Sequence, residues 1–302
     1  LSSDPCKKVS LDISQYLGRS FKIELQTSNK YDDDISVIDD FSIRLLSCNV
    51  PSSLGATNIS STEADLFWTP GGASDFIVEW GPKGFQPGTG NRFAATNDTV
   101  SISGLNIATE YDFYVQDSCS ATDVSPQVGP FTFKTAYEPY YVNGFDPYPG
   151  LDWEEAEGLF SQQPINYGSS LWGQDEFGNV STNSQSANVN IYGTTRDEWI
   201  VSPLITIDTA DYALEYDVAF TDWPNTTPGI WGPDDTVHVV VSTDGGQTWP
   251  RANIIKTYSS ASYPTNTGSR EVLPLLQFKN QTIRIGFYAE STVSNEDNDF
   301  FI

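Results

Sequence analysis

Apolar and polar residues alternate along short stretches of this chain, and such stretches recur about every ten residues. Alternation places apolar side chains on one face of a strand and polar side chains on the other, which is typical of half-buried β-strands. No stretch of useful length shows the spacing of an amphipathic helix. The pattern therefore predicts an all-β protein. The runs that carry it include FKIEL, ADLFW, DFIVEW, YDFYVQ, YALEYDVAF, TVHVVVS and TIRIGFYAE.

Length and charge limit the classes of protein and partner. A chain of 302 residues is long enough for two or three domains, each with its own core. Its 40 acidic residues against 15 basic ones give a net charge of −25, which disfavours nucleic acid and anionic membranes as partners. No apolar run approaches the roughly 18 residues of a membrane-spanning helix, so we expect no membrane insertion. Short strands separated by turn residues are typical of secreted all-β proteins.

Residues 49–136 carry motifs of one known domain. The stretch VPSSLGATNISSTEADLFW, with Trp68 at a core position, is followed by DFIVEW, by EYDFYVQDSC and by GPFTFKT. These motifs resemble a fibronectin type III domain of the kind found in secreted Bacteroidota proteins. The resemblance implies a two-sheet sandwich with Tyr111 as its tyrosine corner. It also implies a disulfide between Cys48 and Cys119, worth about 4 kcal/mol, although two free, buried thiols are the alternative.

Two other parts of the chain resemble each other. The stretch LDISQYLGRSFKIELQTSNKYDDDISVIDDFSI near the start parallels LPLLQFKNQTIRIGFYAESTVSNEDNDFFI at the end. This alignment sets Ile38 against Ile302, so the first copy continues with Asp39 and Asp40 where the second copy stops. We therefore predict that residues 1–48 are the C-terminal strands of one domain. Residues 137–302 are predicted to be a second copy that lacks its last strand.

The repeated domain carries NGFD at 143–146, DEWIVSPLITI at 197–207 and NDFFI at 298–302. It resembles the jelly-roll modules of the MAM, cleaved-adhesin and choice-of-anchor type. The expected architecture is thus a fibronectin type III sandwich between a jelly-roll tail fragment and a nearly complete jelly-roll sandwich. In such modules a calcium ion commonly ties the opening segment to the closing strand, and Ca²⁺ prefers oxygen ligands. The ligands that the resemblance implies are Asp146, Asp197 and, in the first copy, Asp39 or Asp40. Asp299 and Asp297 are looser candidates.

The stretch VSTDGGQTW at 241–249 resembles the Asp-box of sialidases, with Ser242, Asp244, Gly246 and Trp249 in its fixed places. Sialidases carry several such boxes and an arginine cluster for the substrate carboxylate, whereas this chain has one box and no comparable cluster. We interpret the stretch as a hairpin turn. Its two glycines can take positive φ, and Asp244 can accept hydrogen bonds from the turn amides.

Other catalytic motifs are missing from the sequence. His238 is the only histidine, so it cannot form a Ser-His-Asp, Cys-His or two-histidine metal site with others. A glycosidase needs only two carboxylates, and the densest acidic stretch is DWEEAEG at 152–158. A solvated acidic loop or a cation site is the simpler interpretation of that stretch. We expect no enzymatic activity in this chain.

The stretch TDWPNTTPGIWGPDD places Trp223 and Trp231 in one loop rich in proline and glycine. Loops at the ends of sandwiches carry function, and aromatic rings stack on sugars or anchor protein partners. Trp223 and Trp231 are therefore the candidate ligand-binding residues. The alternative is that both rings hold the loop onto its own sheet.

Two functional hypotheses follow. The first is a non-catalytic segment of a large secreted or surface-attached repeat protein, acting as an adhesin or as an extended stalk stiffened by calcium. The second is a pair of accessory glycan-binding modules of a secreted hydrolase. The expected partner is a glycan or a protein on a surface, or a neighbouring copy of the chain. In the last case the first 48 residues supply a missing strand to the second jelly-roll of the neighbour.

Overall fold

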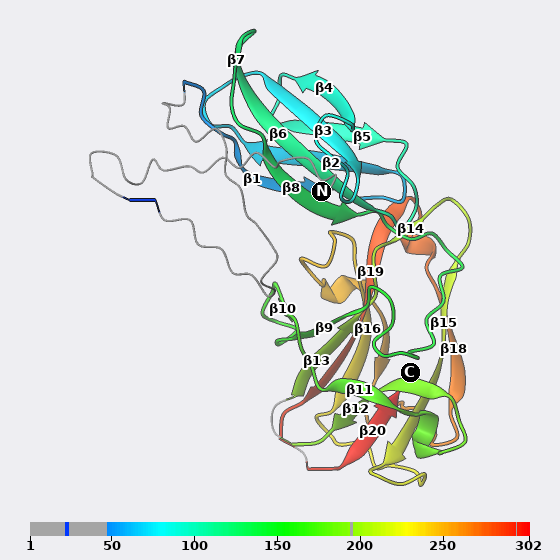
Figure 1. The fold of residues 1–302 in the computed structure, drawn as a ribbon. Coiled ribbons are helices and arrows are strands. Elements are labelled where there is room, and N and C mark those ends of the chain that lie inside the picture. Colours follow the sequence, from blue (N-terminus) through cyan, green and yellow to red (C-terminus); the bar gives the residue numbers. More distant parts are fainter. Residues whose placement is uncertain (1–21, 24–46, 194–195, 294) are drawn as a thin grey trace, which may run out of the picture.

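A computed structural model describes residues 22–23, 47–193, 196–293 and 295–302. The regular structure of these residues consists of β-strands and short 3₁₀ turns, so the all-β prediction is confirmed. The strands form two bodies stacked end to end (Figure 1). Nearly all of the predicted tail fragment, including Asp39 and Asp40, lies outside the described residues. No helix among the described residues is long and apolar enough to cross a membrane.

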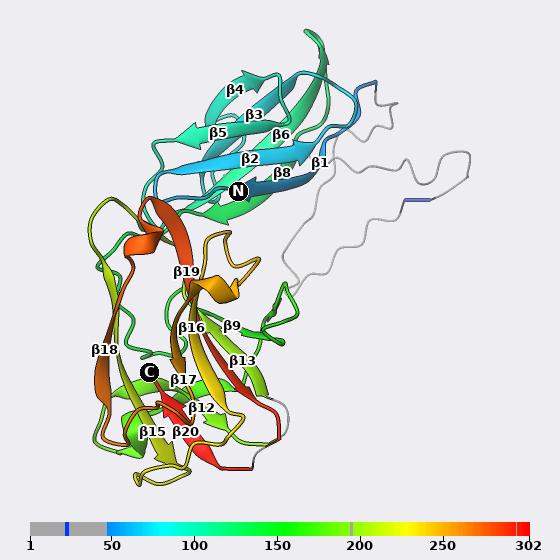
Figure 2. The ribbon, with the colours of Figure 1, turned by 180° about the vertical axis from the view of Figure 1, so that it is seen from behind.

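The first body is a fibronectin type III-like sandwich. One sheet has the order β1-β2-β5 and faces the viewer in Figure 2. The other has the order β4-β3-β6-β7, and β8 also pairs with β6. The strands are β1 (Ser52–Thr57), β2 (Glu63–Thr69), β3 (Phe76–Pro82), β4 (Asn91–Ala95), β5 (Thr99–Ser103), β6 (Glu110–Ser120), β7 (Asp123–Val124) and β8 (Val128–Lys134).

Alternate residues of these strands fill the space between the two sheets. On β2 the side chains of Leu66 and Trp68 are buried while their neighbours along the strand are not, which is the expected period of two. The Trp68 ring meets the Phe76 ring edge-on at 5.2 Å. The Tyr111 hydroxyl accepts a hydrogen bond from the backbone N–H of Asn106 at 2.8 Å. The predicted tyrosine corner is therefore confirmed.

A disulfide closes the first body. Cys48, which lies just before β1, is bonded to Cys119 near the end of β6, with an S–S distance of 2.10 Å. The two cysteines are 71 residues apart in the sequence, so the bridge encloses most of this sandwich. The pairing is the one that the fibronectin type III resemblance implied.

The second body is a larger sandwich of two antiparallel sheets. One has the order β10-β9-β13-β19-β16-β17, with β14 also pairing with β19; the other has the order β11-β12-β20-β15-β18. The strands are β9 (Glu154–Glu157), β10 (Asn166–Tyr167), β11 (Trp172–Glu176), β12 (Gln185–Ile191), β13 (Arg196–Val201), β14 (Ile205–Ile207), β15 (Ala213–Asp222), β16 (Thr236–Ser242), β17 (Ile254–Tyr258), β18 (Ser269–Pro274), β19 (Gln281–Ser291) and β20 (Asn298–Phe301).

Two apolar clusters hold this second body together. The main core lies between the sheets, where Val237, Val239 and Val241 of β16 face residues such as Phe300 of β20. A second cluster covers the outer face of the larger sheet and includes Phe160, Trp199, Trp249 and Tyr288. His238 points to this outer face, where its ring packs near Phe160 and Tyr288, as the alternation of β16 predicts.

Removal of the disulfide should destabilise the first body selectively. In the double variant Cys48→Ala/Cys119→Ala the unfolded chain regains the freedom of a 71-residue separation, so its free energy of unfolding should fall by about 4 kcal/mol. Guanidinium unfolding, followed by tryptophan fluorescence, measures this change. Added reductant should not lower the stability of the double variant further, because it has no disulfide to reduce. An unfolding midpoint equal to that of the unmodified chain would contradict the expectation.

Candidate functional site

The loop between β15 and β16 places its two tryptophans in different environments. Trp231 is 5% exposed and belongs to the main core. Its ring packs on Phe220 at 4.5 Å and stacks on Tyr263 at 5.4 Å, and its Nε1–H donates to the Asp235 carbonyl at 2.7 Å. The Trp231 ring therefore holds the loop onto its own sheet and does not present a face to a ligand.

Trp223, by contrast, is 52% exposed. Its backbone N–H donates to the Asp297 carbonyl at 3.0 Å, which joins this loop to the segment before β20. Ile230, in the same loop, and Tyr263 are also exposed. We call the exposed side chains of Trp223, Ile230 and Tyr263 the loop-end surface. The loop between β15 and β16, which carries the first two, lies at the end of the second body away from the first (Figure 1).

Polar groups border the loop-end surface. The side-chain amide of Asn225 donates to the Asp222 carboxylate at 2.9 Å, and both residues are close in sequence to Trp223. The Asn298 side chain bonds both backbone groups of Ile230 and so fixes that part of the loop. An exposed ring beside carboxylate and amide groups has the chemistry to stack on a sugar and bond its hydroxyls.

Asp299, one of the predicted calcium ligands, lies on the outer face of β20. Its carboxylate is 1% exposed and accepts hydrogen bonds from the side-chain amides of Asn179 at 3.0 Å and Asn190 at 3.1 Å. Burial raises the pKa of Asp299, and the negative charges of Asp175 and Asp297 raise it further, although the two amides oppose this. The amides of Asn179 and Asn190 occupy both oxygens of the Asp299 carboxylate.

The other predicted ligands lie on separate elements. Asp146 is in the loop before β9, and Asp197 is on β13, opposite Glu290 of β19. The structure does not bring Asp146, Asp197 and Asp299 together. Within the described part of the chain, no group of three or more His, Cys, Asp or Glu side chains could hold a metal ion. Calcium binding stays a prediction of the sequence, because Ca²⁺ also takes carbonyl and amide oxygens as ligands.

The Asp-box stretch is a turn, as interpreted from the sequence. Asp244 Oδ1 accepts hydrogen bonds from the backbone N–H groups of Gln247 at 3.1 Å and Thr248 at 2.9 Å. The two glycines have φ of 80° and 92°. The turn delivers the buried Trp249 to the outer cluster, where its ring lies 5.3 Å from that of Trp199. In the structure, this motif therefore positions Trp249 in the outer apolar cluster.

The acidic stretch at 152–158 is not a loop throughout, because Glu154–Glu157 form strand β9. The prediction of a solvated loop was wrong here because β13 pairs with this segment and buries Ala156. Glu154 forms an ion pair with Arg284, and Glu155 accepts a hydrogen bond from the Tyr148 hydroxyl at 2.9 Å. Both carboxylates thus have structural partners.

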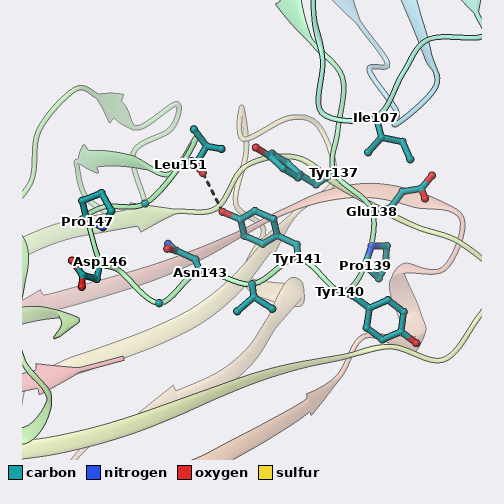
Figure 3. Close-up of a pocket in the computed structure, with 13 residues that line it drawn as sticks. Ile107, Tyr137, Glu138, Pro139, Tyr140, Tyr141, Asn143, Asp146, Pro147 and Leu151 are labelled. Carbon is teal, nitrogen blue, oxygen red and sulfur yellow. Dashed lines mark hydrogen bonds between the residues drawn. The ribbon is translucent and has the colours of Figure 1, made fainter. Parts of the chain in front are cut away.

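A cavity of about 610 Å³ lies where the two bodies meet (Figure 3). Sequence reasoning missed it, although the run YEPYYV at 137–142 signals an aromatic segment between the two sandwiches. Tyr140 and Val142 are 95% and 86% exposed. The Tyr141 hydroxyl donates to the Leu151 carbonyl at 3.1 Å, which closes the loop on itself. The residues that line the cavity are Ile107, Tyr137–Gly144, Asp146, Pro147, Gly150 and Leu151.

No protein-family model matches this chain. No curated protein matches it either. Among solved structures, the FN5 domain of Drosophila Lar is 20% identical to this chain. The match covers 28% of this chain and 94% of the Lar domain, with a TM-score of 0.25. The fn3 domain of human contactin 1 is 17% identical to this chain. The match covers 41% of this chain and 100% of the contactin domain, with a TM-score of 0.28.

A structure of carbohydrate-binding modules from the β-sandwich superfamily is 8% identical to this chain. The match covers 85% of this chain and 97% of the chain in that structure, with a TM-score of 0.34. All three TM-scores lie below 0.5, so no function is inferred from these similarities.

Asp244→Ala should destabilise the second body in a pH-dependent way. Burial alone would raise the pKa of Asp244, but hydrogen bonds from Thr248, Ser242 and the Gln247 amide outweigh it and lower the pKa. A carboxyl whose folded pKa is lowered stabilises the fold above its unfolded pKa, and this stabilisation is lost as the pH falls through the folded pKa. We expect a loss of about 1–2 kcal/mol at pH 7 that shrinks below pH 3.8, the ordinary value.

Urea unfolding over a pH series measures the difference between Asp244→Ala and the unmodified chain. Gln247→Ala is the matched control, because it changes an exposed side chain of the same turn and keeps the backbone donor. A destabilisation that is equal at pH 7 and pH 3 would show that the carboxylate charge contributes nothing.

Proposed function

We propose that this chain is a non-catalytic segment of an extracellular repeat protein, in which the two sandwiches form a rigid spacer of an adhesin or stalk. The observation that carries the proposal is the junction between the two bodies. The first body ends with β8 at Lys134, and by Tyr137 the chain is already bonded to the second body. A flexible linker would have separated the domains, whereas this connection leaves almost no free residue.

Backbone hydrogen bonds lock this connection in place. The Tyr137 N–H donates to the Leu204 carbonyl, and the Thr206 N–H donates to the Tyr137 carbonyl, both at 2.8 Å. Tyr137 thus makes a parallel bridge beside Ile205 of β14. Because backbone bonds fix both the direction and the rotation of a segment, they orient the second body on the end of the first.

Side chains strengthen the same junction from both bodies. The Ser61 N–H of the first body donates to the Thr206 hydroxyl of the second at 3.0 Å. Lys134 forms an ion pair with Asp152, and its ammonium lies 5.2 Å from the centre of the Tyr137 ring. These contacts cross the boundary at separate points, so they resist bending in more than one direction.

The proposed extracellular location, and the proposal that the parent is a surface repeat protein, rest on features that are less specific than the junction. A disulfide and a fibronectin type III-like sandwich are typical of extracellular proteins, where thiols oxidise. The motifs of the second body resemble MAM-like, cleaved-adhesin and choice-of-anchor jelly-rolls of Bacteroidota surface proteins. The sequence similarity of the two ends supports a tandem array in the parent protein. An array of such rigid units would form a surface filament, with calcium as a further predicted stiffening ligand.

A spin-label distance measurement tests the rigid junction. Labels on Thr99→Cys in β5 and on Ser260→Cys after β17, in a Cys6→Ser background, report the separation of the two bodies. We expect one narrow distance distribution, because the Tyr137 bridge fixes both bodies. Insertion of Gly-Ser-Gly-Ser between Ala136 and Tyr137 should broaden it severalfold.

The matched control is the same insertion after Gly88, in an exposed turn of the first body, which should leave the distribution narrow. A broad distribution in the chain without insertion would overturn the rigid-spacer proposal.

The exposure of Trp223 favours a second candidate function, that of an accessory glycan-binding module. The net charge of −25 disfavours acidic polysaccharides, so neutral sugars are the ligands to test. Trp223→Ala should abolish retention on neutral polysaccharides in affinity electrophoresis while the unfolding temperature stays unchanged, because the ring is exposed. Trp231→Ala, which empties part of the core, should instead cost about 3–5 kcal/mol of stability. Equal retention of the Trp223→Ala variant and the unmodified chain would exclude this surface as a sugar site.

A further inference from the structure

Exposed apolar side chains gather around the cavity between the two bodies (Figure 3). Ile107 of the first body lines this cavity, and so do Tyr140, Val142 and Leu151 of the segment that follows β8; all of them are exposed. Single exposed apolar side chains are common, whereas a group of them in one place marks an interaction site. The volume of about 610 Å³ is in the range of ligand-binding sites. The cavity is therefore a candidate docking site.

Tyr140 has a backbone conformation that its own packing does not explain. Its φ is 71°, in the left-handed region that non-glycine residues rarely adopt, although its side chain is almost fully exposed. Phe145 and Asp152 also have positive φ. Phe145, however, is buried in the main core, and Asp152 forms an ion pair with Lys134. Strained conformations cluster at functional sites, and here the strain displays a ring to solvent.

Most polar side chains of the cavity wall are already bonded within the protein. The Tyr141 hydroxyl donates to a backbone carbonyl at 3.1 Å and accepts from the Trp153 Nε1–H at 2.9 Å. The Tyr137 hydroxyl donates to the Asp152 carboxylate. The Asn143 side chain bonds two backbone groups of its own loop, at 2.9 and 3.0 Å. These bonds fix the wall before a partner binds, which lowers the entropic cost of binding.

Two carboxylates of the wall, by contrast, are uncompensated. Glu138 and Asp146 are exposed, and neither has a hydrogen bond or an ion pair to another described residue. Among the described residues that line the cavity, none is a lysine or an arginine. Figure 3 shows the two carboxylates on opposite sides of the Tyr137 and Tyr141 rings, whose centres are 4.8 Å apart. Carboxylates only accept hydrogen bonds, so ammonium and guanidinium groups, which only donate, complement them.

We propose that the cavity docks a segment of a protein partner with apolar side chains in its centre and a basic side chain on each side. The apolar centre covers Tyr140, Val142 and Leu151. The basic side chains pair with Glu138 and Asp146. The net charge of −25 attracts such a partner before contact. This inference goes beyond the rigid-spacer function and does not depend on it.

The same wall is less suited to a neutral sugar. Sugar hydroxyls both donate and accept hydrogen bonds, so they need donors as well as acceptors in the wall. The hydroxyls of Tyr137 and Tyr141 and the amide of Asn143 are already bonded. Glu138 and Asp146 donate nothing, and a neutral ligand leaves their charges uncompensated. A basic segment neutralises both charges.

Selection of peptides tests the chemistry of the partner without assuming its sequence. The bait is the full chain, immobilised through an N-terminal biotin, and the probe is a library of random decapeptides displayed on phage. Enriched peptides should carry basic residues on both sides of an apolar centre. The double variant Glu138→Gln/Asp146→Asn should lose the preference for basic residues, because its neutral amides do not attract positive charge.

The most enriched peptide, labelled with fluorescein, then measures affinity by fluorescence anisotropy. Tyr140→Ala should weaken binding about tenfold or more, because aromatic side chains dominate the affinity of such interfaces. Tyr140→Phe keeps the ring and should bind like the unmodified chain. The unfolding temperature should stay the same in both variants, because the side chain is exposed.

The charge is tested in the same assay. Glu138→Gln should weaken binding of the peptide about threefold or more, and the difference should shrink as salt is added. The matched control is Glu296→Gln, which makes the same change at an exposed position just before β20. This control should bind like the unmodified chain.

Each outcome decides the proposal. Enriched peptides with basic flanks, which lose affinity in Tyr140→Ala and Glu138→Gln but not in Tyr140→Phe or Glu296→Gln, support it. No enrichment, apolar peptides without basic residues, or equal binding by all four variants overturns it. No enrichment combined with retention on a neutral polysaccharide that Tyr140→Ala abolishes also overturns it, because the cavity is then a sugar site.

Discussion

Strand β19 is the element on which the rest of the second body depends. It pairs with β13, β14 and β16, and its residues from Ile283 to Ala289 are all buried. A strand in an antiparallel sheet usually has one wet face, and one that is covered on both faces needs a layer on each side. The other sheet covers the inner face of β19. The outer face is covered by the cluster around Trp199 and Trp249.

This double burial gives a physical reason for features that look functional in isolation. The Asp-box turn delivers Trp249 to the outer face of β19, where Gly286 leaves room for it: an added Cβ at Gly286 would lie 2.9 Å from the Trp249 ring. Arg284, a buried charge on β19, donates to the Ser202 carbonyl at 2.7 Å and pairs with Glu154. A sialidase-like motif and an acidic stretch thus both contribute to the cover of one strand.

β19 also links the core of the second body to its junction with the first body. Through β14 it holds the segment that bonds Tyr137, so the orientation of the first body depends on the same sheet.

The sequence by itself determined many of the strands, because a period of two in side-chain polarity is a local property. It also predicted the turn at Asp244 and, through a family resemblance, the place of Tyr111 and the pairing of Cys48 with Cys119. Only the tertiary structure distinguished the buried Trp231 from the exposed Trp223, although both occur in one loop.

The same limit applies to the acidic residues and to the cavity. Asp146, Asp197 and Asp299 look alike in the sequence, yet the structure separates them and gives Asp299 two asparagine partners. β9 was missed because its pairing with β13 outweighs its acidic composition. The cavity beside Tyr140 exists only where the two bodies meet. In each case contacts between residues far apart in the chain determine burial and partners, and these contacts leave no local pattern in the sequence.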